Sequence, residues 1–224
     1  SLFHPSVIRT LAESPAISGE IWVGTDDSNV QVTRDSGHTW IDVSPPDLPE
    51  WTTITSIDVS HHEPGTVYIS GGRHRVSDRT PYLYKTTDYG DSWKRITNGI
   101  RENDFSWVVR EDPVRRGLLY AGTETGAYIS FNDGKAWQAL QGNLPPVMVM
   151  QMRVKDDDLV VATHGRGFWI LDNISSFRGI TPDVTSATVH LFDPAPAYRH
   201  LRGGRSWIGG ALGLFSGAKN PSRG

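Results

Sequence analysis

An eight-residue motif that ends in tryptophan occurs three times in the chain, and this repeat constrains the fold more than any other feature. Thr33–Trp40 (TRDSGHTW) recurs as Thr86–Trp93 (TTDYGDSW) and, less closely, as Ser130–Trp137 (SFNDGKAW). The three terminal tryptophans are 53 and 44 residues apart. A period of about 40–55 residues is typical of the four-stranded blades of a β-propeller.

Apolar segments flank each motif at similar spacing and complete the repeating unit. Short strands are predicted at Ile21–Thr25, Val67–Gly71, Leu119–Thr123 and Val160–Thr163, each with a further apolar strand upstream. The fourth unit ends near Asn173 and lacks the tryptophan motif. We therefore expect an all-β chain of about four antiparallel four-stranded blades, a partial ring, over residues 1–175. Residues 176–224 are expected to form an irregular linker or tail, with docking on the propeller as one alternative.

The composition of the chain excludes several classes of protein. The 22 basic and 25 acidic residues give a net charge of −3, which excludes a strongly cationic nucleic-acid binder. The absence of cysteine excludes disulfides and thiolate metal sites. No apolar run reaches the roughly 18 residues of a membrane span, and the first residues do not read as a signal peptide. No metal, phosphate or dinucleotide motif is present, so no cofactor is expected.

The motif matches S/T-x-D-x-G-x-S/T-W and resembles the Asp box of the BNR-repeat propellers, which include sialidases, sortilin-type receptors and xyloglucan-degrading hydrolases. Ala162–Asp172 is similar to the end of the propeller in large, mostly exported bacterial BNR proteins labelled glycosyl hydrolase or sortilin-like. Leu191–Arg199 is similar to the linker that follows there. The resemblance implies an extracellular or periplasmic location and a chain that is a fragment of a longer protein.

The motif residues are expected to be structural. The carboxylate can accept hydrogen bonds from its own loop, the glycine takes a positive φ, and the indole covers the edge between neighbouring blades. A calcium site would need more oxygen ligands than one turn supplies. The positions concerned are Asp35, Gly37, Trp40, Asp88, Gly90, Trp93, Asn132, Gly134 and Trp137.

A ligand site is expected on the face where the second-to-third strand turns and the blade-to-blade connections emerge. Guanidinium, imidazole and aromatic groups in these loops suit a sugar or an anionic group. The alternative is that they are solvated loop tips and packed aromatics. The candidates are Trp51, Arg73, His74, Arg75, Trp107, His164 and Arg166.

Two functions remain open from the sequence. The first is a binding or interaction module for a glycan or a protein, with self-association through open blade edges as a further expectation. The second is a glycoside hydrolase or part of one, which needs two carboxylates about 5–10 Å apart. Asp104 and Glu124 are the main candidates on the loop face, where Asp26 and Glu50 also lie. The R-I-P segment expected of a sialidase is absent.

Overall fold

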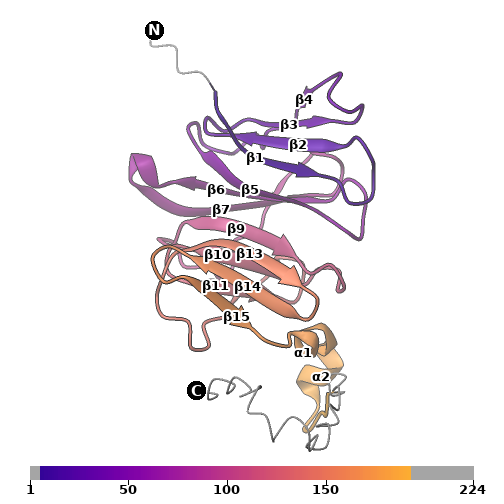
Figure 1. The fold of residues 1–224 in the computed structure, drawn as a ribbon, viewed down its shortest axis with the longest axis vertical. Helices are drawn as coiled ribbons and strands as arrows, with labels where there is room; N and C mark the ends of the chain where they lie inside the picture. Colours follow the sequence, from indigo (N-terminus) through magenta and orange to yellow (C-terminus); the bar gives the residue numbers. More distant parts are fainter. Residues whose placement is uncertain (1–5, 193–224) are drawn as a thin grey trace, which may run out of the picture. The chain divides into compact units, whose positions relative to one another are not determined.

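The computed structural model describes residues 6–192, which form four successive antiparallel sheets in chain order (Figure 1). Each sheet is a meander in which consecutive strands pair, so each is one blade. Blade 1 holds β1 (Ile8–Glu13), β2 (Ile21–Thr25), β3 (Val30–Thr33) and β4 (Ile41–Asp42); blade 2 holds β5 (Thr53–Val59), β6 (Val67–Arg73), β7 (Asp78–Thr86) and β8 (Lys94–Arg95); blade 3 holds β9 (Ser106–Glu111), β10 (Leu119–Thr123), β11 (Ala127–Ser130) and β12 (Gln138–Ala139); blade 4 holds β13 (Val149–Lys155), β14 (Asp158–Thr163) and β15 (Phe168–Leu171). The predicted all-β, four-blade organisation is confirmed.

Blade 4 differs from the other three because it has three strands. Within residues 6–192, no strand pairs with the outer side of β15. The first strands of successive blades (β1, β5, β9 and β13) lie next to one another, so the blades pack through their inner strands. Their alternating apolar side chains, such as Ile54, Val108 and Val149, are fully buried.

The three repeated turns share one hydrogen-bond pattern. In the first turn, the Asp35 carboxylate accepts hydrogen bonds from the Thr39 N–H at 2.8 Å and from the Thr39 hydroxyl at 2.6 Å. The Thr33 hydroxyl donates to Asp35 and accepts from the Gly37 N–H. The second turn repeats these bonds around Asp88. The third turn loses one bond, because Ala136 has no hydroxyl to give to Asn132.

The tryptophans that end the second and third turns contact the preceding blade. The Trp93 indole N–H donates to the Val43 carbonyl at 2.7 Å, and that of Trp137 donates to the Ile96 carbonyl at 2.6 Å. Trp40 is 42% exposed, because no described blade precedes blade 1. The tryptophan thus joins consecutive blades wherever a preceding blade is present.

Arg110 on β9 links three blades. Its guanidinium donates to the Ser56 hydroxyl at 2.8 Å in blade 2 and to the Met152 carbonyl at 3.2 Å in blade 4. It also lies 3.4 Å from the Asp58 carboxylate, which accepts a hydrogen bond from the Glu111 N–H. Burial raises the pKa of Asp58 to about 6, although Arg110 and the Glu111 N–H act in the opposite direction.

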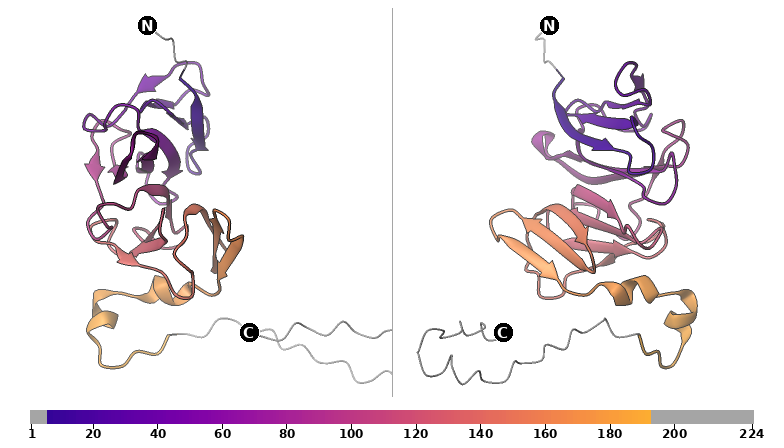
Figure 2. Two further views of the ribbon diagram at one scale, coloured as in Figure 1. Left: turned by 90° about the vertical axis from the view of Figure 1, so that its left-hand side faces the viewer. Right: turned by 45° about the vertical axis from the view of Figure 1, so that its right-hand side comes forward.

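Two short helices, α1 (Ser175–Gly179) and α2 (Pro182–Ser186), follow β15 (Figure 2). Arg178 of α1 forms ion pairs with Asp112 of blade 3 at 3.0 Å and Asp157 of blade 4 at 2.5 Å. One compact unit extends to Phe192 and includes both helices. The predicted irregular tail is therefore partly helical, and its remainder, residues 193–224, lies outside the described residues.

Candidate functional site

A pocket of about 200 Å³ lies where blades 1 and 2 meet, on the face predicted to carry the second-to-third strand turns and the blade connections. The residues that line it, here named the Trp51 pocket, are Ser6, Asp26, Asp27, Trp51, Thr53, Arg75 and Val76. They come from the β2–β3 turn, the connection between blades 1 and 2, the insertion after β6, the residues before β1 and the start of β5. Two sequence-predicted candidates, Trp51 and Arg75, therefore meet at one site.

Trp51 is held at the rim of this pocket by the backbone around it. Its side chain is 55% exposed, and its φ of 64° is in the left-handed region that a large side chain rarely adopts. Ser28 links the two loops, because its hydroxyl donates to the Pro49 carbonyl at 3.0 Å and accepts from the Thr52 N–H at 2.8 Å. Strained backbone of this kind recurs at functional sites, and it also occurs in the repeated turns at Ser36, Tyr89 and Asp133.

Two carboxylates, Asp26 and Asp27, line the Trp51 pocket as well. One oxygen of Asp27 accepts hydrogen bonds from Ser6, Thr25 and Asn29. Burial works against its ionisation, but these bonds outweigh burial and hold the pKa of Asp27 below its ordinary value. One oxygen of Asp26 accepts from the Val7 N–H. The pocket thus presents ring, carboxylate and guanidinium groups together, which can stack on and hydrogen-bond to a hydroxylated ligand.

A second cluster gathers the predicted candidates His74 and Trp107. The His74 ring stacks on Phe105 at 5.1 Å between centroids and lies 5.4 Å from the Trp107 ring at a tilt. Burial lowers the pKa of His74, and the nearby Arg75 acts in the same direction, while Glu124 acts against it; the shift favours the neutral imidazole. Its Nδ1 is buried and has no hydrogen-bond partner among the described residues. This packing suits a His74 side chain that anchors the insertion after β6 to the rings of Phe105 and Trp107.

Arg73 is occupied by an internal ion pair. Its guanidinium donates to Asp78 at 2.6 Å, and the Tyr82 hydroxyl donates to the same carboxylate at 2.8 Å. Burial opposes ionisation of Asp78, but hydrogen bonds from Thr80, Tyr82 and Arg73 lower its pKa to about 2. The ion pair and hydrogen bonds to Asp78 therefore stabilise the insertion after β6 where it joins the sheet, and Arg73 is one of the residues that make them.

The two candidate catalytic carboxylates both bind to other side chains of the protein. Asp104 is 1% exposed and accepts four hydrogen bonds, from the Thr123, Thr125 and Tyr128 hydroxyls and from the Thr125 N–H. Glu124 forms an ion pair with Arg79. These four donors occupy the oxygens of Asp104 inside the protein. The geometry favours a structural role for Asp104.

His164 and Arg166 lie apart from the Trp51 pocket, in the turn between β14 and β15. Both are exposed, and the glycines between and after them have φ values of 84° and 70°. The Arg166 carbonyl accepts a hydrogen bond from the Trp169 indole at 3.1 Å. Neither side chain lines the Trp51 pocket.

Three lining residues of the Trp51 pocket, Ser6, Thr53 and Val76, are absent from the sequence-based candidates. Ser6 precedes the first strand, Thr53 begins β5, and Val76 ends the short 3-10 helix. Nothing in the repeat marks them, because each lies outside the recurring segments. The position of Ser6 beside Asp27 depends on its hydrogen bond, at 2.7 Å.

Metal and membrane features are absent from the part of the chain that the structure describes. No group of three or more His, Asp or Glu side chains there is arranged to hold a metal ion. No helix between residues 6 and 192 is long and apolar enough to cross a bilayer.

Comparison with known proteins identifies the fold. No protein-family model matches the chain, and no curated protein sequence matches it. Among solved structures, it is similar to YCF48 bound to D1 peptide (TM-score 0.56, 19% identity, 75% of this chain and 51% of that chain). It is also similar to the GH74 xyloglucanase from Xanthomonas campestris (TM-score 0.58, 18% identity, 75% of this chain and 28% of that chain). A further similar structure is the GH74 enzyme from Niastella koreensis (TM-score 0.55, 19% identity, 75% of this chain and 24% of that chain). The chain spans about half or less of each protein. These similarities show that the four blades form a partial β-propeller.

Proposed function

We propose that the chain is the blade array of an Asp-box propeller that acts as a binding module, and that the Trp51 pocket takes a glycan. The Asp-box assignment is supported by the three turns in which Asp35, Asp88 and Asn132 accept hydrogen bonds from their own loops. The glycan assignment depends on one observation: Trp51, which is 55% exposed, lines the same pocket as the carboxylates Asp26 and Asp27.

The chemistry of this pocket suits a neutral or amino sugar. An aromatic face binds the apolar C–H face of a pyranose ring, and carboxylates accept hydrogen bonds from sugar hydroxyls. Asp26 and Asp27 together carry more negative charge than Arg75 offsets, which disfavours a polyanionic ligand. The pocket is open, so it fits the end or one unit of a longer chain.

Binding is tested with a glycan array followed by calorimetry on the positive hits. Trp51→Ala is expected to weaken binding about tenfold or more, which corresponds to about 1.4 kcal/mol or more. Asp26→Asn keeps an oxygen acceptor for the Val7 N–H and should weaken binding less. Trp40→Ala is the matched control, since Trp40 is also exposed but does not line the Trp51 pocket. Retained affinity in Trp51→Ala would refute the assignment.

A glycoside hydrolase is the second candidate, and the fold similarity to GH74 enzymes supports it. The same chain covers only 28% and 24% of those enzymes. Asp104 is committed to internal hydrogen bonds, so catalysis would need other carboxylates of the loop face, such as Asp26. Turnover of a chromogenic glycoside that is lost in Asp26→Asn would favour this candidate over binding alone.

Self-association through the open blade edges stays a proposal. Ile8, Leu11 and Ile41 on blade 1 are each more than half exposed, and such side chains favour contact with another chain. Light scattering that shows only monomers across the micromolar range would contradict it.

A further inference from the structure

A pocket of about 260 Å³ lies between blades 2 and 3, beside the second and third repeated turns. Three of the five lysines in the chain line it, namely Lys85, Lys94 and Lys135. The other lining residues are Thr87, Ser92, Trp93, Ile96 and Asp133. We name it the lysine pocket. It shares no residue with the Trp51 pocket, so it is a separate site.

The lysine pocket carries an excess of positive charge, although the chain as a whole has a net charge of −3. Asp133 is the only acidic residue among the described residues that line it. This carboxylate is occupied, because it forms an ion pair with Lys85 and accepts a hydrogen bond from the Tyr68 hydroxyl at 2.7 Å. Lys94 and Lys135 are exposed, and neither forms an ion pair with any residue between positions 6 and 192. Two ammonium groups are therefore available to a ligand.

Comparison with the first two blades explains why the pocket is open. Arg34, at the second position of the first turn, lies over the ring of Tyr89 in the second turn, with 4.0 Å between the guanidinium carbon and the ring centroid. The equivalent residues one blade later are Thr87 and Asp133, and both are smaller. The repeat position that Arg34 and Tyr89 fill between blades 1 and 2 is consequently open between blades 2 and 3.

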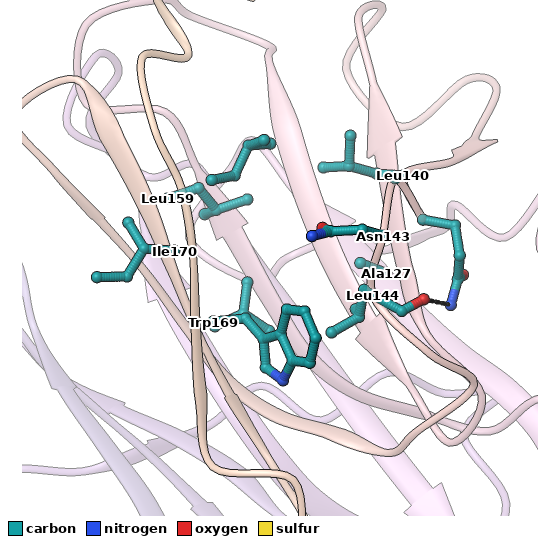
Figure 3. A pocket seen from close by; sticks show the side chains of 11 residues that line it. Ala127, Leu140, Asn143, Leu144, Leu159, Trp169 and Ile170 are labelled. Atoms are coloured by element: carbon teal, nitrogen blue, oxygen red, sulfur yellow. Dashed lines mark hydrogen bonds between the residues drawn. The ribbon is translucent and has the colours of Figure 1, made fainter. Parts of the chain in front are cut away.

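The pocket between blades 3 and 4 has a different character (Figure 3). Its volume is about 80 Å³, and its side chains include Leu140, Leu159 and Trp169. No charged residue is among the described residues that line it. The third turn carries Phe131 at the position of Thr87. The accumulation of lysines therefore belongs to the contact between blades 2 and 3 and is not a general property of the repeat.

We propose that the lysine pocket binds a phosphate monoester. Lysine ammonium groups bind phosphate oxygens as point charges, and a monoester carries a charge of about −1.5 to −2 at pH 7, which matches the two unpaired lysines. The Thr87 hydroxyl makes no hydrogen bond to a described residue, so it can donate to an ester oxygen. The Trp93 ring lines the same pocket and offers an apolar surface to the organic part of the ester. A pocket of this volume suits a small ester such as a sugar phosphate.

Calorimetry of the full chain with glucose 6-phosphate tests the proposal, with glucose as the neutral control. Saturable binding is expected for the phosphate and not for glucose, because the affinity comes from the charge. The double variant Lys94→Gln with Lys135→Gln should weaken binding about tenfold or more. Lys155→Gln is the matched control, since Lys155 is also exposed but lies outside the lysine pocket, and it should change the affinity less than about twofold. Trp51→Ala should leave the affinity unchanged, which separates this site from the proposed glycan site.

A further variant tests the space in the pocket without changing its charge. Thr87→Phe introduces the residue that the third turn carries at this position, Phe131. The larger side chain should fill the lysine pocket and weaken binding about fivefold or more. Near-ultraviolet circular dichroism verifies that each variant is folded.

Four results would overturn the proposal. The first is a lack of saturable binding of glucose 6-phosphate. Equal effects of Lys155→Gln and the double variant would assign the binding to diffuse surface charge, and an unchanged affinity in Thr87→Phe would place the ligand outside the lysine pocket. Glucose 6-sulfate, which carries one negative charge, should bind more weakly than the phosphate; equal or tighter binding would show that the site does not recognise a phosphate monoester.

Discussion

Replacing Gly90 by alanine is expected to destabilise the protein more than the same change at Gly37, although the two glycines hold the same place in the repeat. Their φ values are 90° and 93°, so alanine meets the same backbone strain at both positions, about 1–2 kcal/mol. The surroundings differ. A Cβ at Gly90 would lie 2.6 Å from Val43 Cβ in blade 1, whereas a Cβ at Gly37 meets no atom within 4 Å.

The clash adds the cost of overpacking, about 1–3 kcal/mol, at Gly90 alone. Gly37→Ala should therefore lower the free energy of unfolding by about 1–2 kcal/mol, and Gly90→Ala by about 2–5 kcal/mol. Urea unfolding followed by near-ultraviolet circular dichroism measures both. With an m-value of about 2.5 kcal/mol/M, the midpoints should separate by about 0.4–1.2 M. Coincident midpoints would refute the claim that this glycine makes room for the preceding blade.

Three further predictions concern contacts between blades. Trp137→Phe should lower the free energy of unfolding by about 1–3 kcal/mol, because the buried Ile96 carbonyl loses its hydrogen-bond donor. Trp40→Phe should change the free energy of unfolding by less than about 0.5 kcal/mol. Equal effects of the two variants in urea unfolding would contradict this. Because burial raises the pKa of Asp58 to about 6, the folded protein binds this proton more tightly than the unfolded chain does. The free energy of unfolding should therefore fall as the pH rises from about 4 to about 6, and Asp58→Asn should flatten the profile; an unchanged slope in the variant would refute it. Arg178→Ala should release α1 and speed limited proteolysis near residue 175, with Arg166→Ala, an exposed arginine in a turn, as the control that leaves the rate unchanged.

The repeat made the blades predictable, because a motif with fixed spacing carries its own strand order and turn geometry. Trp51 lies in a blade connection and Arg75 in a second-to-third strand turn, so the order of strands in a blade predicts that both lie on one face, and both line the Trp51 pocket. The burial of Asp104 could not be predicted, since its donors Thr123, Thr125 and Tyr128 come from the next hairpin. Helix α1 was missed because five residues contain no measurable periodicity, and its position depends on ion pairs made by Arg178.

The indole bonds of Trp93 and Trp137 both point from a blade to the one before it, which gives the array a direction. Each of these bonds stabilises one interface, that of blade 2 with blade 1 or that of blade 3 with blade 2. The interaction energy is therefore shared only between neighbouring blades. A linear array of this kind unfolds by loss of its terminal units before its central ones. Backbone amides of β6 and β10 should consequently exchange with solvent more slowly than those of β2 and β14, and cooperativity should decrease when the contact between blades 2 and 3 is weakened.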